Sequence, residues 1–220
     1  MKRSIAIALV VSLSAIAFAG GHNSLHNPHP SPPIVHDEAP ATPDDIVLDR
    51  AAIRAQLAAA RAANLAAFRA YVKAGTFPSN TYKPGELNVW RDRDGHLCAA
   101  ATIIDASGQH ALVRRIADDD NFIRLGDVTD GPLMDWMLTS GLTQDEIAAI
   151  QEPFGPVVEP NEQPGTQLVD ARRRRAEDAR LAKRYAEVTR ALVEGAERSL
   201  DLATDRVMAR PELARRLVSA

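Results

Sequence analysis

The feature that most constrains this 220-residue chain is a helical repeat of apolar residues in two long stretches. In the first, the steps of three and four residues give the 3.6-residue period of one helix face. The second has an average step of about 3.7, the period of a straight helix rather than of a left-handed coiled coil. The positions are Ile53, Leu57, Ala60, Asn64, Phe68 and Tyr71, then Leu181, Tyr185, Val188, Leu192, Ala196, Leu200, Ala203 and Val207.

These repeats predict a fold that is mainly α, of the α+β type. The first helix begins near Asp44 and ends at Gly75, a residue suited to a helix C-cap. The second runs from about Thr166 to Ala209, and Pro211 starts a short terminal helix. We expect the apolar face of the long second helix to be covered by the first helix, or by a protein partner or a second copy of the chain.

One stretch between these helices resembles a sheet. Residues 86–92 include apolar and β-forming side chains, Asp94-Gly95 suits a tight turn, and residues 97–104 end in β-branched residues. They predict a small β-hairpin over about 86–104, with helices covering one face. Three consecutive alanines at 99–101 leave a buried helix open as the alternative for the second strand.

Three shorter helices are expected in the middle of the chain. One covers residues 109–117, one begins at Pro132 and ends at Gly141, and one is opened by the capping box from Thr143 to Glu146. The last two have the shape of a helix–turn–helix. Because the first of the pair is nearly all apolar and the second has no Arg or Lys, we expect core packing and no nucleic-acid partner.

The chain begins with the pattern of a secretory signal peptide. Lys2 and Arg3 precede an apolar run, interrupted only by Ser12 and Ser14, that ends in Ala17-Phe18-Ala19, with small residues where signal peptidase reads them. The run is shorter than the roughly 20 residues that span a bilayer. We therefore expect cleavage after Ala19, export to the periplasm or the medium, and no transmembrane segment in the mature chain.

The expected organisation follows from these patterns. A tail over 20–43 contains six prolines and four histidines and has too few large apolar groups to fold. Prolines also mark a linker. The segments are a signal peptide (1–19), the Pro/His-rich tail (20–43), a compact helical domain with the hairpin (44–155), a Pro-rich linker (156–165), and a long amphipathic helix with a short terminal helix (166–220).

The new N-terminus created by cleavage is a candidate metal site. It would start Gly20-Gly21-His22, so a free amine, two amide nitrogens and an imidazole can surround one ion in a plane. Four nitrogens in a plane suit Cu(II) or Ni(II). His26 follows on the same tail as a further candidate ligand. The pattern resembles the amino-terminal copper- and nickel-binding motif of unrelated peptides and secreted proteins. The competing interpretation is an ordinary polar tail.

Cys98 is the single cysteine, so no disulfide can form within the chain. It is also a candidate nucleophile, with His96 or His110 as the base and Asp105 or Asp127 as the orienting carboxylate. Catalytic cysteines often start helices, which lower the thiol pKa, whereas Cys98 is expected inside the hairpin. A small buried thiol packed among alanines is the competing interpretation.

Charge is distributed unevenly along the chain. Residues 76–165 hold 6 Lys and Arg against 15 Asp and Glu, whereas residues 166–220 hold 13 against 9. Arg172 to Arg175 open the long helix as either an anion contact or a solvated helix start. The sequence predicts an exported, non-enzymatic interaction or scaffold protein of the cell envelope. A metal-handling protein acting through the histidine tail and a Cys98-dependent hydrolase are the alternatives.

Overall fold

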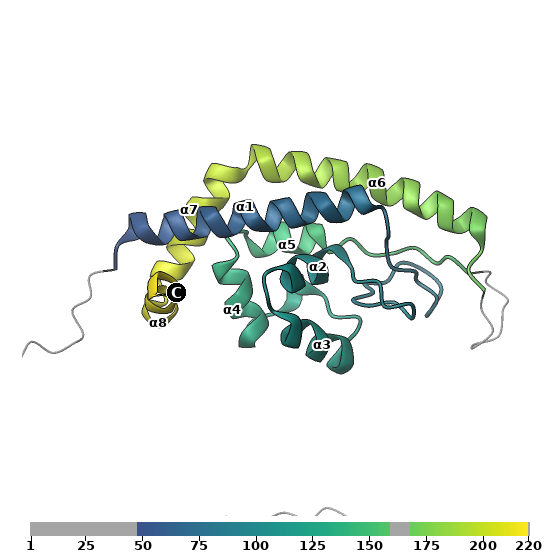
Figure 1. The fold of residues 1–220 in the computed structure, drawn as a ribbon, viewed down its shortest axis with the longest axis horizontal. Helices are drawn as coiled ribbons and strands as arrows, with labels where there is room; N and C mark the ends of the chain where they lie inside the picture. The colour runs from purple at the N-terminus through teal and green to yellow at the C-terminus, as the bar shows by residue number, and fades with distance from the viewer. Residues whose placement is uncertain (1–47, 159–167, 220) are drawn as a thin grey trace, which may run out of the picture. The chain divides into compact units, whose positions relative to one another are not determined.

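The structure, a computed structural model, describes residues 48–158 and 168–219 and is mostly helical, as the sequence predicts. The signal peptide, the Pro/His-rich tail and most of the predicted linker lie outside these residues. Figure 1 shows the described elements as a ribbon. They are α1 (Arg50–Ala74), α2 (Ala99–Ala106), α3 (His110–Asp119), the 3₁₀ turn η1 (Leu125–Asp127), α4 (Gly131–Thr139), α5 (Gln144–Ile150), α6 (Ala171–Glu194), α7 (Ala196–Met208) and α8 (Pro211–Ser219).

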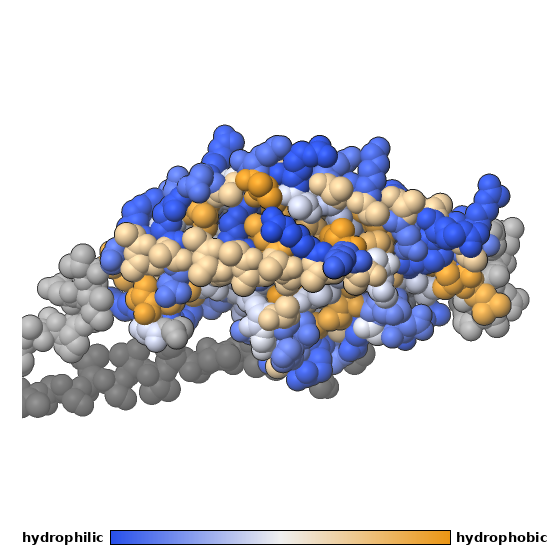
Figure 2. All heavy atoms as spheres, turned by 45° about the horizontal axis from the view of Figure 1, so that its top comes forward, coloured by the Kyte–Doolittle hydropathy of each residue, from blue (hydrophilic) through white to orange (hydrophobic). Residues whose placement is uncertain are grey.

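Helix α1 forms on the predicted apolar repeat, but it begins at Arg50 and not near Asp44. Its N-cap is Asp49, whose carboxylate accepts hydrogen bonds from the first amides, and Gly75 ends it in the left-handed conformation at φ 65°. The outer face carries many alanines, which Figure 2 shows as a pale-orange band along the helix. The buried face consists of Ile53, Leu57, Arg61, Asn64, Phe68 and Tyr71.

The second long repeat is divided into two helices, which corrects the prediction of one continuous helix. Gly195 ends α6 and starts α7, and the chain changes direction there in Figure 1. A glycine facilitates such a kink because it lacks a side chain. The predicted apolar face is buried on both sides of the break. Three ion pairs join α7 to α1: Arg50 pairs with Asp205, and Arg54 pairs with both Asp201 and Glu197.

The predicted hairpin is reduced to one antiparallel bridge, between Arg91 and Leu97. The chain turns between them, but the expected second strand ends at once because residues 99–106 form α2. This corrects the strand prediction in favour of the helical alternative that the alanines left open. Alanine is the strongest helix former, and Cys98 caps the helix start by accepting a hydrogen bond from the Ala101 amide.

The three middle helices α3, α4 and α5 form where the sequence places them. Both hydrogen bonds of the capping box between Thr143 and Glu146 are present at the start of α5. The turn between α4 and α5 approaches α1 so closely that only glycine fits at position 141. A Cβ atom there would lie 2.0 Å from the Leu57 carbonyl oxygen, and its φ is +74°.

The core lies between the long helices and the middle of the chain. Tyr185 of α6 contacts three aromatic rings from α1 and the following loop at centroid distances of 5.5–5.7 Å. A smaller cluster joins the first half of α1 to α7 and α8. No helix among the described residues is both long enough and apolar enough to cross a membrane.

Candidate functional site

The predicted metal site lies outside the described residues. Gly20, Gly21, His22 and His26 all belong to the N-terminal segment, so copper or nickel binding there stays a prediction.

Cys98 lies in the core at the start of α2, with 1 % of its surface exposed. Burial raises the pKa of its thiol to about 12, although hydrogen bonds from the Ala101 and Ala100 amides act in the opposite direction. A thiol with this pKa is protonated at neutral pH, and only the thiolate is a strong nucleophile. This geometry gives the hydrolase hypothesis no support.

The two candidate bases hydrogen-bond to carboxylates. His110 Nδ1 lies 2.7 Å from Asp105 Oδ1, which is one of the proposed base–carboxylate pairs, but both side chains are exposed. His96 Nδ1 lies 3.0 Å from Asp92 Oδ2. Among the described residues, neither ring has a hydrogen bond to Cys98.

Asp92, Asp94 and His96 are the closest grouping of metal-ligating types in the described chain, with ligand atoms within 4.8 Å of one another. The Asp92 carboxylate already has hydrogen-bond partners within the protein. This buried carboxylate accepts hydrogen bonds from the amides of Ser79, Asp94 and His96 and contacts the His96 ring, all at 2.8–3.0 Å. We therefore assign this group to closing the turn and fixing it to the loop at Ser79.

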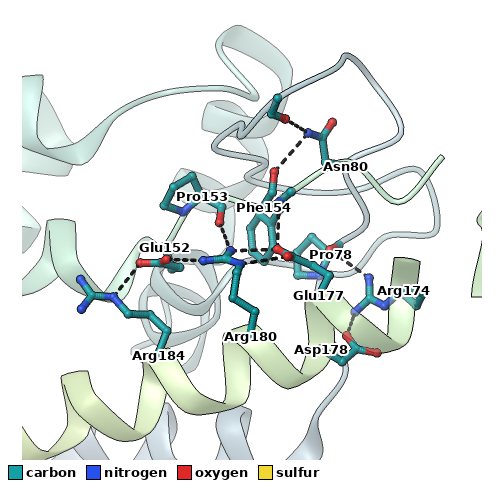
Figure 3. A network of polar contacts seen from close by, with 12 residues as sticks. Pro78, Asn80, Glu152, Pro153, Phe154, Arg174, Glu177, Asp178, Arg180 and Arg184 are labelled. Atoms are coloured by element: carbon teal, nitrogen blue, oxygen red, sulfur yellow. Dashed lines mark hydrogen bonds and ion pairs between the residues drawn. The ribbon is translucent and has the colours of Figure 1, made fainter. Parts of the chain in front are cut away.

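A network of arginines and carboxylates fixes α6 to two loops (Figure 3). Arg180 donates to Glu152 at 2.7 Å, to Glu177 at 2.8 Å and to the Pro153 carbonyl at 2.6 Å. Burial opposes ionisation of Glu177, but hydrogen bonds from Arg180 and the Gly155 amide outweigh it and lower the pKa of this carboxyl.

The arginine run at the start of α6 contributes to the same network. Arg174 donates to the Pro78 carbonyl at 3.1 Å and to the Ser79 hydroxyl at 2.9 Å, and it pairs with Asp178 (Figure 3). One member of the run is thus a structural contact to the loop that follows α1. The solvated-helix interpretation does not hold for Arg174.

A second network, which the sequence analysis missed, lies inside the protein. Arg61 of α1 is 3 % exposed and makes two hydrogen bonds to Glu146, at 2.7 and 2.8 Å. It also donates to the carbonyls of Gly141 and Leu192, so one side chain joins α1, α5, α6 and the turn before α5. Arg61 lies four residues after Leu57 and therefore on the same apolar face of the helix. This spacing was the sequence signal that could have predicted a buried arginine.

A surface groove of about 550 Å³ lies next to the Arg180 network, which it meets at Pro153. One wall is the segment at Glu86–Asn88 and the other is the loop at residues 122–127. The groove is lined by Lys83, Glu86, Leu87, Asn88, Phe122, Arg124, Leu125, Gly126, Asp127, Ala148, Gln151 and Pro153. These residues come from three parts of the chain, so no local pattern could have predicted the groove.

Hydrogen bonds hold both walls in place. Gln151 of the α5 C-terminus binds Ile123 and Leu125 through both ends of its amide, at 2.8 Å each. Gln144 donates to the carbonyls of Leu125 and Val128. On the other wall, Leu87 and Phe154 exchange two main-chain hydrogen bonds. The groove is thus formed in advance of any ligand.

No protein family model, curated protein or solved structure matches this chain.

Proposed function

We propose that the protein is an exported, non-enzymatic interaction or scaffold protein whose binding surface is the groove between residues 86–88 and 122–127. The observation that carries this proposal is the groove itself, with a volume of about 550 Å³ and two walls fixed by hydrogen bonds. Ligand pockets in proteins have volumes of roughly 300–1,000 Å³ and are mostly formed in advance.

The buried side chains that could act as nucleophiles, acids or bases also support this proposal. The Cys98 thiol is enclosed, Asp92 closes a turn, and Glu146 and Glu177 are held by arginines. Each therefore has a structural role in the folded chain.

Photo-crosslinking in the producing cell tests the proposal. Replacing Phe122 by p-benzoylphenylalanine should give one discrete adduct, identified by mass spectrometry and reproduced with the purified partner. The control places the same residue at Val193, which is exposed on α6 and does not line the groove. Equal adducts at both positions, or none at Phe122, would contradict a binding role for the groove.

The exported location rests on the signal-peptide pattern of residues 1–19. Cell fractionation followed by N-terminal sequencing tests it. We expect exported protein that begins at Gly20, and intact Met1 on protein outside the cytoplasm would contradict the predicted cleavage.

A metal-handling role is the second candidate function, because the expected mature chain starts Gly20-Gly21-His22. We expect the processed protein to bind one Cu(II) in a square-planar site. Titration followed by visible spectroscopy tests this, with His22→Ala as the variant that loses the site. A protein with one extra residue before Gly20 should also lose it, since the imidazole would then occupy the fourth position.

A further inference from the structure

One wall of the groove is the segment at residues 86–88, which forms a single antiparallel bridge at Leu87 and whose main chain at Asn88 has no hydrogen bond among the described residues. Leu87 exchanges hydrogen bonds with Phe154 at 3.0 and 2.9 Å, which fixes the direction of its own N–H and C=O groups. Because the residue after a hydrogen-bonded antiparallel pair presents its main-chain groups to the opposite side, we expect Asn88 to present its own away from Phe154. Asn88 also lines the groove.

Two residues after Asn88, the main chain pairs with the segment that forms the other wall. The Trp90 amide donates to the Asn121 carbonyl at 2.8 Å, and the groove opens where the two segments separate, between residues 86–88 and 122–127. The main chain of Asn88 has no hydrogen bond within the described part of the chain. Unpaired main-chain groups beside an existing bridge can accept a further extended segment.

The lining of the groove favours an uncharged ligand. Lys83 and Arg124 balance Glu86 and Asp127, so the rim has no net charge. Leu87, Leu125, Ala148 and Pro153 supply apolar surface.

An aromatic ledge extends the apolar surface at one end. Phe122 is 40 % exposed, and its ring lies 5.1 Å from that of Tyr82 in an edge-to-face arrangement. The Arg93 guanidinium lies 5.2 Å from the Tyr82 ring centroid. Such a partly exposed aromatic side chain is a common anchor for binding.

We propose that the groove binds an uncharged, apolar extended peptide segment of a partner, which adds as a strand and pairs with the main chain of Asn88. Phe122 packs against the peptide's apolar side chains. This inference rests on the proposed function and specifies its ligand.

The test uses the mature full-length protein and the synthetic peptide acetyl-Thr-Val-Thr-Val-Thr-amide, followed by NMR titration and amide exchange. We expect binding to slow exchange of the Asn88 amide at least tenfold and to shift the Phe122 ring resonances. The variant Asn88→Pro removes the N–H and should weaken binding at least tenfold, because proline cannot donate. Asn88→Ala keeps the main chain and should bind as the unchanged protein does.

A peptide with N-methyl groups on both valines should bind more weakly than the parent peptide. Peptides in which Glu or Lys replaces a residue should bind no more tightly than the parent. If Asn88→Pro lowers the melting temperature, its weaker binding could come from partial unfolding. The test of strand addition is then the amide exchange rate of Asn88 in the unchanged protein. Unchanged exchange at saturating peptide, or equal affinity for the methylated peptide, would overturn strand addition. The crosslink at Phe122 is read separately. A partner adduct without peptide binding would retain the interaction function and reject this ligand class.

Discussion

At the scale of single residues, burial determines the pKa and the hydrogen-bond partners of the titratable side chains. Cys98 starts a helix, a position that often activates a thiol, yet burial raises its pKa to about 12. Arg61 shows the opposite case, since its two terminal nitrogens donate to Glu146 and to two carbonyls, although its buried Nε has no hydrogen-bond partner among the described residues. The same side-chain types would have other properties at the surface.

Cys98 should therefore be unreactive in the folded protein. We expect native protein at pH 8 to show almost no reaction with a thiol-specific disulfide reagent, measured by absorbance, because the thiol is 1 % exposed and protonated. The control is the same protein in concentrated guanidinium, where one thiol should react at once. Native labelling at the rate of the unfolded chain would show that Cys98 is accessible, and the hydrolase hypothesis would regain support.

At the scale of elements, the helices depend on close contacts at a few positions. Helix α6 contributes Leu192 to the core and leaves its neighbour Val193 half exposed. Gly141 lets the turn before α5 touch α1. Each position offers a matched pair of substitutions.

Leu192→Asp should lower the free energy of unfolding by at least about 3 kcal/mol, because it removes apolar burial and places a carboxylate in the core. Val193→Asp introduces the same group at a side chain that is 52 % exposed and should change little. Thermal unfolding followed by circular dichroism compares the two. Equal melting temperatures would mean that α6 does not pack as described.

Gly141→Ala should be more harmful than Gly108→Ala. Both positions have positive φ, which costs an alanine about 1 kcal/mol. A Cβ at Gly108 meets nothing within 4 Å, whereas at Gly141 it would lie 2.0 Å from the Leu57 carbonyl oxygen and displace α1. Urea unfolding measures the difference, and equal losses would argue against the close approach.

At the scale of the whole molecule, two carboxylates connect folding to pH. Burial opposes ionisation of Glu146 and Glu177, but hydrogen bonds from Arg61 and Arg180 prevail, and the pKa of each lies below its usual 4.5. The folded state therefore binds fewer protons than the unfolded chain near these values. The resulting stabilisation is present above pH 4.5 and is lost as the pH falls through the folded-state pKa values.

We accordingly expect the urea midpoint to fall between pH 6 and pH 3. Glu177→Gln removes one of the two titrations, so the variant should be less stable at pH 6 but should lose less between the two pH values. A midpoint that does not change over this range would show that neither carboxylate is coupled to folding.

The sequence by itself determined the long helical stretches and their C-terminal ends, because helix period and caps are local properties. Their starts, at Arg50 and Ala171, lie a few residues after the expected ones. The apolar repeat predicted the buried face of α1, Gly75 its end, and the Thr143–Glu146 capping box the start of α5. It also predicted the buried face of α6 and α7, although not their separation at Gly195. The N-terminal export and metal patterns are local as well, and they stay predictions.

Only the tertiary structure decided which polar residues enter the core and where the surface is hollow. Residues 99–106 form a helix where the composition allowed either a helix or a strand, and packing against the rest of the core selects between them. The Arg61–Glu146 contact joins residues 85 positions apart, and the groove combines segments near residues 86, 124 and 150. Such arrangements depend on which faces meet in space, and a local repeat does not encode that.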